Sequence, residues 1–303
     1  MKNALSALLK GEVIALPTET VYALAADSEN LSAIARIYAL KKRPKNKALS
    51  LLIADLKAVK TFAHHIPQEA FSLMHAFWPG PLTLILPGLN QQSIALRMPS
   101  NAFVLSLIQQ LSQRKGKIAA LCAPSANLSG TFSPTLSKHV LADFGHSFLI
   151  VSGTCALGIE STIVDCTCEP FQIIRSGAIL LKDLQKIIPN IQIKKNQNNE
   201  NNNKTKSNQN YYLFSFNQIE NFLNQHSNKK NIVLGFQQPQ NTHCNWIQTQ
   251  KNPKLYAQEL YIHLRKIEHL QCDFVLLESP PQNEHWQAVW NIFHGQLKKI
   301  FNF

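Results

Sequence analysis

Two short stretches of the chain gather residue types that bind phosphate. KKRPKNK, residues 41–47, carries five basic side chains in seven positions. An arginine fork beside a lysine commonly holds a triphosphate and neutralises charge that develops on phosphorus. Cations that follow a helix also complement its C-terminus, which accounts for one or two of the five. The others predict contact with nucleotide phosphates or with RNA.

The second stretch is LCAPSANLSG at residues 121–130, and three interpretations are open: a serine nucleophile, a phosphate-holding loop, or a turn before a helix. A nucleophile needs a base and usually a G-x-S-x-G elbow, but Ser125 has no flanking glycines and no His–Asp pair stands out as its partner. We therefore disfavour the nucleophile. Ser125, Asn127 and Ser129 suit a loop that donates hydrogen bonds to phosphate or ribose oxygens. The helix-cap interpretation stays open for Ser133, which directly precedes Pro134.

Other polar side chains emerge at the ends of apolar, strand-like runs. PTET at 17–20 follows EVIAL, and SIALRMP delivers Arg97. GIESTIVD adds Ser161, and IIRSG adds Arg175. Ligands of open α/β sheets gather beyond the strand ends, so these residues are candidates for one site.

Composition limits the class of protein. The 303 residues are enough for two domains, and 45% hydrophobic with 16% charged residues is a globular profile. The formal charge of +12 favours a polyanionic partner or substrate. No apolar run approaches the ~18 residues of a membrane span, and the first residues lack a signal-peptide core. We therefore expect a cytoplasmic protein without membrane contact, in which the six cysteines are reduced.

The pattern of elements predicts two α/β domains. Helical and strand-like segments alternate up to residue 188, which predicts helices packed on a mixed sheet. The expected strands there include 48–54 and 117–123. Residues 189–211 are polar and asparagine-rich, so they predict a flexible linker. In 212–303, strands at 231–236 and 272–278 flank a helix at 253–268, which predicts a small second domain.

Seven motifs now occur in a fixed order along residues 11–188: PTETVY, KKRP, FWPGPLT, RMP, APSANLSG, SPT and GIEST. In this order they resemble the YrdC-like threonylcarbamoyl-AMP synthases. The resemblance implies a YrdC-like twisted mixed sheet with flanking helices. The longer members also have a linker and a small Rossmann-like C-terminal domain, which the layout here resembles.

The resemblance also implies an activity, that of a nucleotidyltransferase. The family forms L-threonylcarbamoyladenylate and pyrophosphate from L-threonine, bicarbonate and ATP. Mg²⁺ is expected with the ATP, and no protein-bound metal is expected. The product supplies a threonylcarbamoyl-transferase complex that modifies tRNA next to the anticodon. tRNA or double-stranded RNA is therefore a further candidate partner.

By the same resemblance, site residues can be assigned one by one. The family's K-x-R and S-x-N signature falls on Lys41, Arg43, Ser125 and Asn127, which we take as catalytic. The residues expected to face ATP are Arg43, Lys47, Ser93, Ser125, Ser133 and Arg175. Those expected in the threonine pocket are Thr20, Arg97, Ala123 and Ser161. The reaction needs no protein nucleophile, because a carbamate oxygen of the substrate attacks the α-phosphorus.

Three positions depart from the family pattern. Ala23 and Ala25 replace glycines, and Leu52 stands where a threonine-contacting histidine is common. One alternative is an RNA-binding protein of the same fold with little synthase activity, although residues 41–47 lack the interspersed aromatics of a stacking platform. The other is a carbamoyl-transfer enzyme of the hydrogenase-maturation type, which ranks last because its zinc-finger cysteines are missing.

Overall fold

The computed structural model describes all residues except 90–91, 195–206, 208, 298–299 and 302–303. Its contacts divide the chain into two compact units. The first unit consists of residues 1–129 and 133–195, and the second of 130–132 and 196–303. Within the described residues, no helix is long and apolar enough to cross a membrane.

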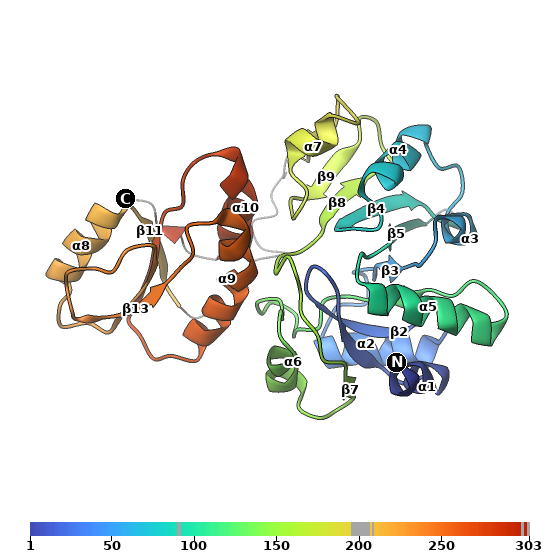
Figure 1. The fold of residues 1–303 in the computed structure, drawn as a ribbon, viewed down its shortest axis with the longest axis horizontal. Helices are drawn as coiled ribbons and strands as arrows, with labels where there is room; N and C mark the ends of the chain where they lie inside the picture. Colours follow the sequence, from blue (N-terminus) through green and yellow to red (C-terminus); the bar gives the residue numbers. More distant parts are fainter. Residues whose placement is uncertain (90–91, 195–206, 208, 298–299, 302–303) are drawn as a thin grey trace. The chain divides into compact units, whose positions relative to one another are not determined.

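The first unit is built on a mixed sheet, as the alternation of elements predicts (Figure 1). Its strands lie in the order β10 (Gln192–Ile193), β9 (Gln172–Arg175), β8 (Thr162–Asp165), β4 (Leu82–Pro87), β5 (Ser93–Arg97), β3 (Leu51–Leu52), β6 (Leu121–Cys122), β2 (Tyr22–Asp27), β1 (Ile14–Pro17) and β7 (Leu149–Ile150). The sheet contains parallel pairs such as β4 with β8 and antiparallel pairs such as β4 with β5. β10 lies inside the range expected as linker.

Helices surround this sheet: α1 (Lys2–Leu9), α2 (Leu31–Lys41), α3 (Val59–Phe62), α4 (Gln68–Phe77), α5 (Ala102–Lys115), α6 (Ser137–Phe144) and α7 (Leu181–Gln185). The Asn30 side chain accepts a hydrogen bond from the Ala33 amide and caps α2. Asn101 caps α5 in the same way, and Gly116 ends that helix in the left-handed conformation.

Strands β1 and β2, next to the β7 edge of the sheet, are buried on both faces. Ala15, Tyr22 and Leu24 face one hydrophobic cluster, whereas Ile14 and Ala23 face the other. This alternation follows from the two-residue period of a strand. Burial on both faces explains why this stretch is a nearly continuous apolar run.

Two strands are shorter than the sequence predicts. The expected strands at 48–54 and 117–123 are paired only over Leu51–Leu52 and Leu121–Cys122. The prediction of long strands was therefore wrong. Beyond these pairs the chain stays close, since the Ala123 amide donates to the Ser50 carbonyl at 2.9 Å, but it turns to line a cavity.

The second unit contains a parallel sheet in the order β13 (Cys244–Gln248), β12 (Asn231–Gly235), β14 (Phe274–Glu278), β11 (Tyr211–Phe214) and β15 (Ile300–Phe301). The helices α8 (Phe216–Gln225), α9 (Pro253–Glu268) and α10 (Gln287–Gln296) connect its strands. Parallel strands joined by crossover helices confirm the predicted small Rossmann-like fold. α9 has the predicted bounds, with Asn252 as its cap and Pro253 in its first turn.

Gly130–Phe132 is grouped with the second unit although it follows the S-x-N motif directly. Phe132 is 2% exposed, and its ring lies 6.1 Å from that of Tyr261 and 6.5 Å from that of Tyr211. Arg265 of α9 donates to the Phe132 carbonyl through Nε, at 3.0 Å, and through Nη2. The buried Arg265 guanidinium and the rings of Tyr211 and Tyr261 therefore hold this segment.

Candidate active site

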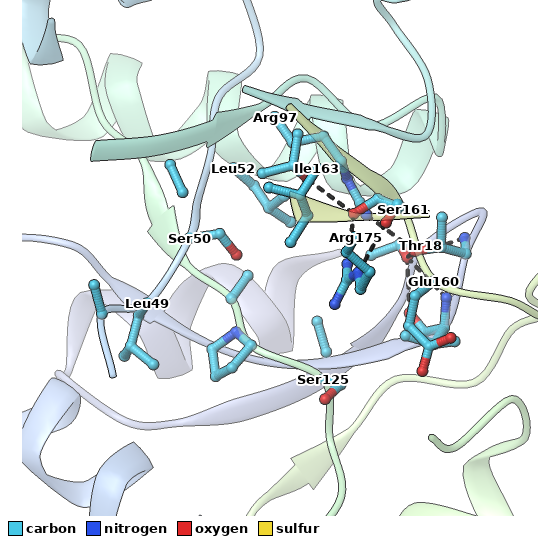
Figure 2. A pocket seen from close by; sticks show the side chains of 18 of the residues that line it. Thr18, Leu49, Ser50, Leu52, Arg97, Ser125, Glu160, Ser161, Ile163 and Arg175 are labelled. Carbon is cyan, nitrogen blue, oxygen red and sulfur yellow. Dashed lines mark hydrogen bonds between the residues drawn. The ribbon is translucent and has the colours of Figure 1, made fainter. Parts of the chain in front are cut away.

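A cavity of about 290 Å³ lies in the first unit against one face of its sheet, where alternate residues of β4 and β5 line it (Figure 2). The residues around it come from the β1–β2 turn, the loop after α2, β3, β4 and β5, the S-x-N loop, and β8 and β9. Its lining residues are Thr18, Thr20, Val21, Ala23, Arg43, Ala48, Leu49, Ser50, Leu52, Thr83, Ile85, Ser93, Ala95, Arg97, Ala123, Pro124, Ser125, Glu160, Ser161, Ile163 and Arg175.

Arg97, the last residue of β5, brings a buried positive charge to this cavity. It is 7% exposed, and its Nη1 donates to Thr20 Oγ1 at 3.0 Å. Burial lowers the pKa of Arg97, and the Glu19 carboxylate, 3.8 Å from Nη2, opposes that shift. Neither Arg97 Nε nor either Glu19 oxygen has a hydrogen-bond partner in the described part of the chain. Since these atoms are themselves buried, an anionic ligand would meet the Arg97 guanidinium where that residue lines the cavity.

The PTET turn holds the hydroxyl that contacts Arg97. Thr18 Oγ1 donates to the Val21 carbonyl at 2.7 Å and lies 2.8 Å from Thr20 Oγ1. The amides of Thr20 and Val21 also donate to Thr18 Oγ1. This closed turn fixes Thr20 at the edge of the cavity.

A second guanidinium is held by the GIEST segment. Arg175 of β9 donates from Nε to the Ser161 carbonyl and from Nη2 to Ser161 Oγ, each at 2.9 Å (Figure 2). Ser161 Oγ also lies 2.8 Å from Thr83 Oγ1. Gly177 permits this packing, because a Cβ there would lie 2.5 Å from the Glu160 carbonyl oxygen and the Ser161 carbonyl carbon. Arg175 and Ser161 thus act as one rigid pair.

The basic loop contributes Arg43 to the cavity. Its Nε donates to the Lys47 carbonyl and its Nη2 to the Ala48 carbonyl, each at 3.0 Å. Partial burial lowers the pKa of Arg43 from its ordinary value. The side chain therefore both shapes the loop over residues 43–48 and places positive charge beside the cavity.

Lys41 behaves differently, and it is not among the lining residues. It is 2% exposed, and its ammonium donates to the Ser125 carbonyl at 2.5 Å and to the Asn127 carbonyl at 2.7 Å. Asn127 Oδ1 lies at 3.4 Å and also accepts from Ser125 Oγ at 2.6 Å. Burial lowers the pKa of Lys41 to about 7; Arg43 adds to this shift and Asp143 opposes it.

The structure brings most of the assigned site residues together around the cavity. Those that line it are Thr20, Arg43, Ser93, Arg97, Ala123, Ser125, Ser161 and Arg175. Lys41, Lys47, Asn127 and Ser133 lie outside its lining. Ser133 donates to Glu160 Oε1 at 2.7 Å, and α6 begins only at Ser137, so the helix-cap interpretation of Ser133 is wrong.

Sequence analysis missed several lining residues. Thr83 and Glu160 lie within the quoted motifs FWPGPLT and GIEST, so their position next to assigned residues was an available signal. Leu49, Ile85 and Ile163 carry no polar group, and their position depends on the fold alone. Leu52 is 2% exposed and belongs to this apolar part of the lining.

Ala23 and Ala25 adopt ordinary backbone conformations in β2. The non-glycine residues with positive φ in the described chain are Lys42 and His65, so neither alanine is strained. Both are buried, and Ala23 lines the cavity. The loss of glycine at these positions therefore costs no backbone strain here.

The chemistry that this arrangement supports is binding and charge neutralisation. Among the lining residues, which the structure describes in full, there is no cysteine and no histidine. Ser125 Oγ donates to an amide oxygen and not to a base, so it is not activated as a nucleophile. Three guanidiniums and several hydroxyls suit a ligand with a carboxylate and phosphates.

Comparison with known families agrees with this geometry. A family model for the Sua5, YciO and YrdC proteins, described as "Telomere recombination", matches residues 6–177. A second model, "Threonylcarbamoyl-AMP synthase, C-terminal domain", matches residues 188–292. The chain belongs to the Sua5–YciO–YrdC family. The second match makes it a two-domain member of Sua5 type.

Two relatives of this Sua5-type chain have the same name, threonylcarbamoyl-AMP synthase. The threonylcarbamoyl-AMP synthase of Pyrococcus abyssi is 39% identical over 197 residues, which are 61% of this chain and 56% of that protein. The Bacillus subtilis enzyme of the same name is 35% identical over 205 residues, 64% of this chain and 58% of that protein. The matched sequence thus spans a little more than half of each relative.

The structural similarity extends further. The crystal structure of P. abyssi Sua5 complexed with L-threonine matches with a TM-score of 0.86 at 28% identity. The match covers 100% of this chain and 95% of that one. The predicted fold class, a mixed-sheet domain followed by a small parallel α/β domain, is therefore confirmed.

Proposed function

We propose that the chain is a threonylcarbamoyl-AMP synthase, which forms L-threonylcarbamoyladenylate and pyrophosphate from L-threonine, bicarbonate and ATP. One observation carries the proposal: a single cavity is lined by three arginines, Arg43, Arg97 and Arg175. A carboxylate and a triphosphate can be neutralised side by side there. The two family matches and the similarity to a relative solved with L-threonine support the same activity.

The amino acid binds, in this proposal, at Arg97. Its α-carboxylate pairs with the Arg97 guanidinium, and the hydroxyls of Thr20 and Ser161 complete the polar contacts. Ala123 borders this part of the cavity. The apolar side chain of Leu52, on the strand paired with β5, faces the methyl group of the substrate.

ATP binds along the loops that carry Arg43, Ser93, Ser125 and Arg175. Lys47 and Ser133 border the same loops and remain assigned to ATP through the resemblance. Mg²⁺ enters with the triphosphate, as MgATP, and is part of the substrate. Lys41 and Asn127, assigned through the K-x-R and S-x-N signature, act in this proposal through the Ser125 turn that they contact.

The reaction then needs positioning and charge neutralisation from the protein. The threonine amine and bicarbonate give a carbamate with loss of water, and a carbamate oxygen attacks the α-phosphorus. The bond from that phosphorus to the β-phosphate oxygen breaks, and pyrophosphate leaves. Arg43 and Arg175 offset the charge that develops on the phosphate oxygens. The carbamate is labile, so the recessed position of the cavity protects it from water.

The decisive experiment measures pyrophosphate release with purified protein, L-threonine, bicarbonate and MgATP. We expect release that requires both threonine and bicarbonate, with threonylcarbamoyladenylate detected by mass spectrometry. Pyrophosphate release without threonine dependence would contradict the proposal. If the protein instead binds RNA tightly, in a salt-sensitive and ATP-independent way, the RNA-binding alternative takes its place.

The downstream role is part of the same proposal. The adenylate would be consumed by a threonylcarbamoyl-transferase complex that modifies tRNA. Adding such a complex and unmodified tRNA to the reaction should place the threonylcarbamoyl group on the adenosine beside the anticodon. This step tests the partner separately from the synthase chemistry.

A further inference from the structure

We propose that Lys41 is a positioning residue, which holds the Ser125–Asn127 turn from behind and does not contact ATP. The inference rests on the proposed synthase function and deepens it. It separates two basic residues of one K-x-R motif: Arg43 faces the cavity, and Lys41 supports the loop on the opposite side.

Each N–H donor of the Lys41 ammonium has an acceptor within the Ser125–Asn127 turn. An ammonium group has three N–H donors, and Lys41 Nζ lies 2.5, 2.7 and 3.4 Å from the Ser125 carbonyl, the Asn127 carbonyl and Asn127 Oδ1. The side chain is 2% exposed and is not among the cavity lining. A phosphate oxygen could reach it only by displacing the turn that it holds.

The backbone explains why Lys41 and Arg43, two positions apart, point in different directions. Lys41 is the last residue of α2, and Lys42 follows in the left-handed conformation with φ 50°. The Arg43 amide then returns to the Tyr38 carbonyl at 3.0 Å, so the chain reverses after the helix. This reversal sends Arg43 to the cavity while Lys41 stays against the core.

A main-chain contact strengthens the same junction. The Ser129 amide donates to the Lys41 carbonyl at 3.0 Å. The end of α2 and the turn over residues 125–129 are therefore joined by both the side chain and the main chain of Lys41. Because Arg43 and Ser125 lie on the two sides of this junction, Lys41 sets their separation across the cavity.

Burial works against the charge on Lys41. The charged groups that act on it are Arg43, beyond the end of α2, and Asp143 on α6. Burial lowers the pKa of Lys41 to about 7, so the ammonium loses a proton just above neutral pH. We expect the turn to loosen with that titration, because a neutral amine has one donor fewer.

The first test needs no variant and no activity. Lysine side-chain NMR follows Lys41, and amide signals follow residues 125–129, from pH 6 to 9. We expect the amides of Asn127 and Ser129 to titrate together with Lys41. Saturating MgATP should then move the pKa of Lys41 by less than about one unit, because the phosphates do not touch it. Amides that ignore the titration, or a rise of more than about two units with MgATP, would overturn the proposal.

The second test uses Lys41→Met, with Lys60→Met, at an exposed position of α3, as the control. We expect Lys41→Met to lower kcat/KM for MgATP by about thirtyfold and to shift the amides of Asn127 and Ser129, with neither effect in the control. When Ser125→Ala is added to Lys41→Met, kcat/KM for MgATP should fall by less than about a further twofold, because Lys41 acts through that turn. Fully multiplicative losses would mean that Lys41 meets the phosphates independently. If the wild type releases no pyrophosphate, the proposed function fails, and the amide shifts still decide the role of Lys41.

Discussion

Two buried cations of the first unit, Lys41 and Arg97, differ in how their side chains are hydrogen-bonded. Lys41 is 2% exposed and Arg97 is 7% exposed, and burial lowers the pKa of both. Three oxygens of one turn surround the Lys41 ammonium. Arg97 keeps Nε without a partner, and its nearest carboxylate lies 3.8 Å away.

The difference separates a cation used for the fold from one held for a ligand. A buried charge is costly unless hydrogen bonds compensate it, so an uncompensated one is retained where a ligand supplies the missing partner. Local violations of packing rules concentrate at functional sites. A buried cation that lines a cavity, as Arg97 does and Lys41 does not, therefore points to substrate more directly than positive charge alone.

The largest effect should come from removing the unsatisfied cation. We expect Arg97→Met to lower kcat/KM for L-threonine by about a thousandfold, because a charge-assisted contact is lost and Glu19 is left buried without its counter-ion. Pyrophosphate release at varied threonine measures the loss. Arg114→Met, on the exposed end of α5, is the matched control and should retain wild-type kinetics. An increase in KM for ATP, with KM for threonine unchanged, would contradict the assignment of Arg97 to the threonine pocket.

The next effect concerns stability against pH. The pKa of Lys41 is lowered from 10.5 to about 7, so between these values the unfolded chain binds more protons than the folded one. The free energy of unfolding of the wild type, relative to Lys41→Met, should therefore rise by about 2 kcal/mol from pH 7 to pH 9. Hydrogen exchange of α2 amides in both proteins measures this difference.

The same titration should weaken function while it stabilises the fold. As Lys41 loses its proton above pH 7, KM for ATP should increase in the wild type but stay flat in Lys41→Met. A constant stability difference across this range would show that Lys41 keeps its charge throughout. That result would place Lys41 closer to an ordinary surface lysine than to a buried cation.

A third buried cation, Arg265, extends the comparison into the second unit. It is 8% exposed and donates twice to the Phe132 carbonyl. We expect Arg265→Met to lower the stability of the second unit by about 1.5 kcal/mol, because a buried carbonyl loses a charged donor. Hydrogen exchange of amides in β11 and α9 measures it, with exposed Lys266→Met as the control. Equal protection in the two variants would show that Phe132 is held by its aromatic contacts alone.

The sequence predicts elements well where local signals are complete. α9 has its predicted bounds because Asn252, Pro253 and an apolar period agree. The strands at 48–54 and 117–123 were overextended, because an apolar extended segment has the same pattern whether it pairs or lines a cavity. Local pattern thus predicts conformation better than it predicts pairing.

The candidate site was predictable in membership but not in role. Residues such as Arg97 and Arg175 could be assigned because charge at the end of an apolar strand is rare. The orientation of Lys41 depends on the left-handed conformation of Lys42, which the sequence does not signal because the residue is not a glycine. The grouping of Gly130–Phe132 with the second unit depends on Arg265, far away in the sequence. Long-range packing decides both.

The smallest effect concerns the apolar side of the cavity, where no cation lies. Leu52 pairs in register with Arg97 and lines the cavity, so its methyl groups can contact the methyl that distinguishes threonine from serine. Leu52→Val removes one methylene and should lower the preference for threonine over serine by at most about tenfold. The ratio of the two kcat/KM values measures it. Leu86→Val removes the same group from a buried residue of β4 outside the cavity lining and should leave the ratio unchanged. An equal change in both variants would mean that selection depends on general packing, and that the polar contacts of Arg97 and Thr20 alone choose the amino acid.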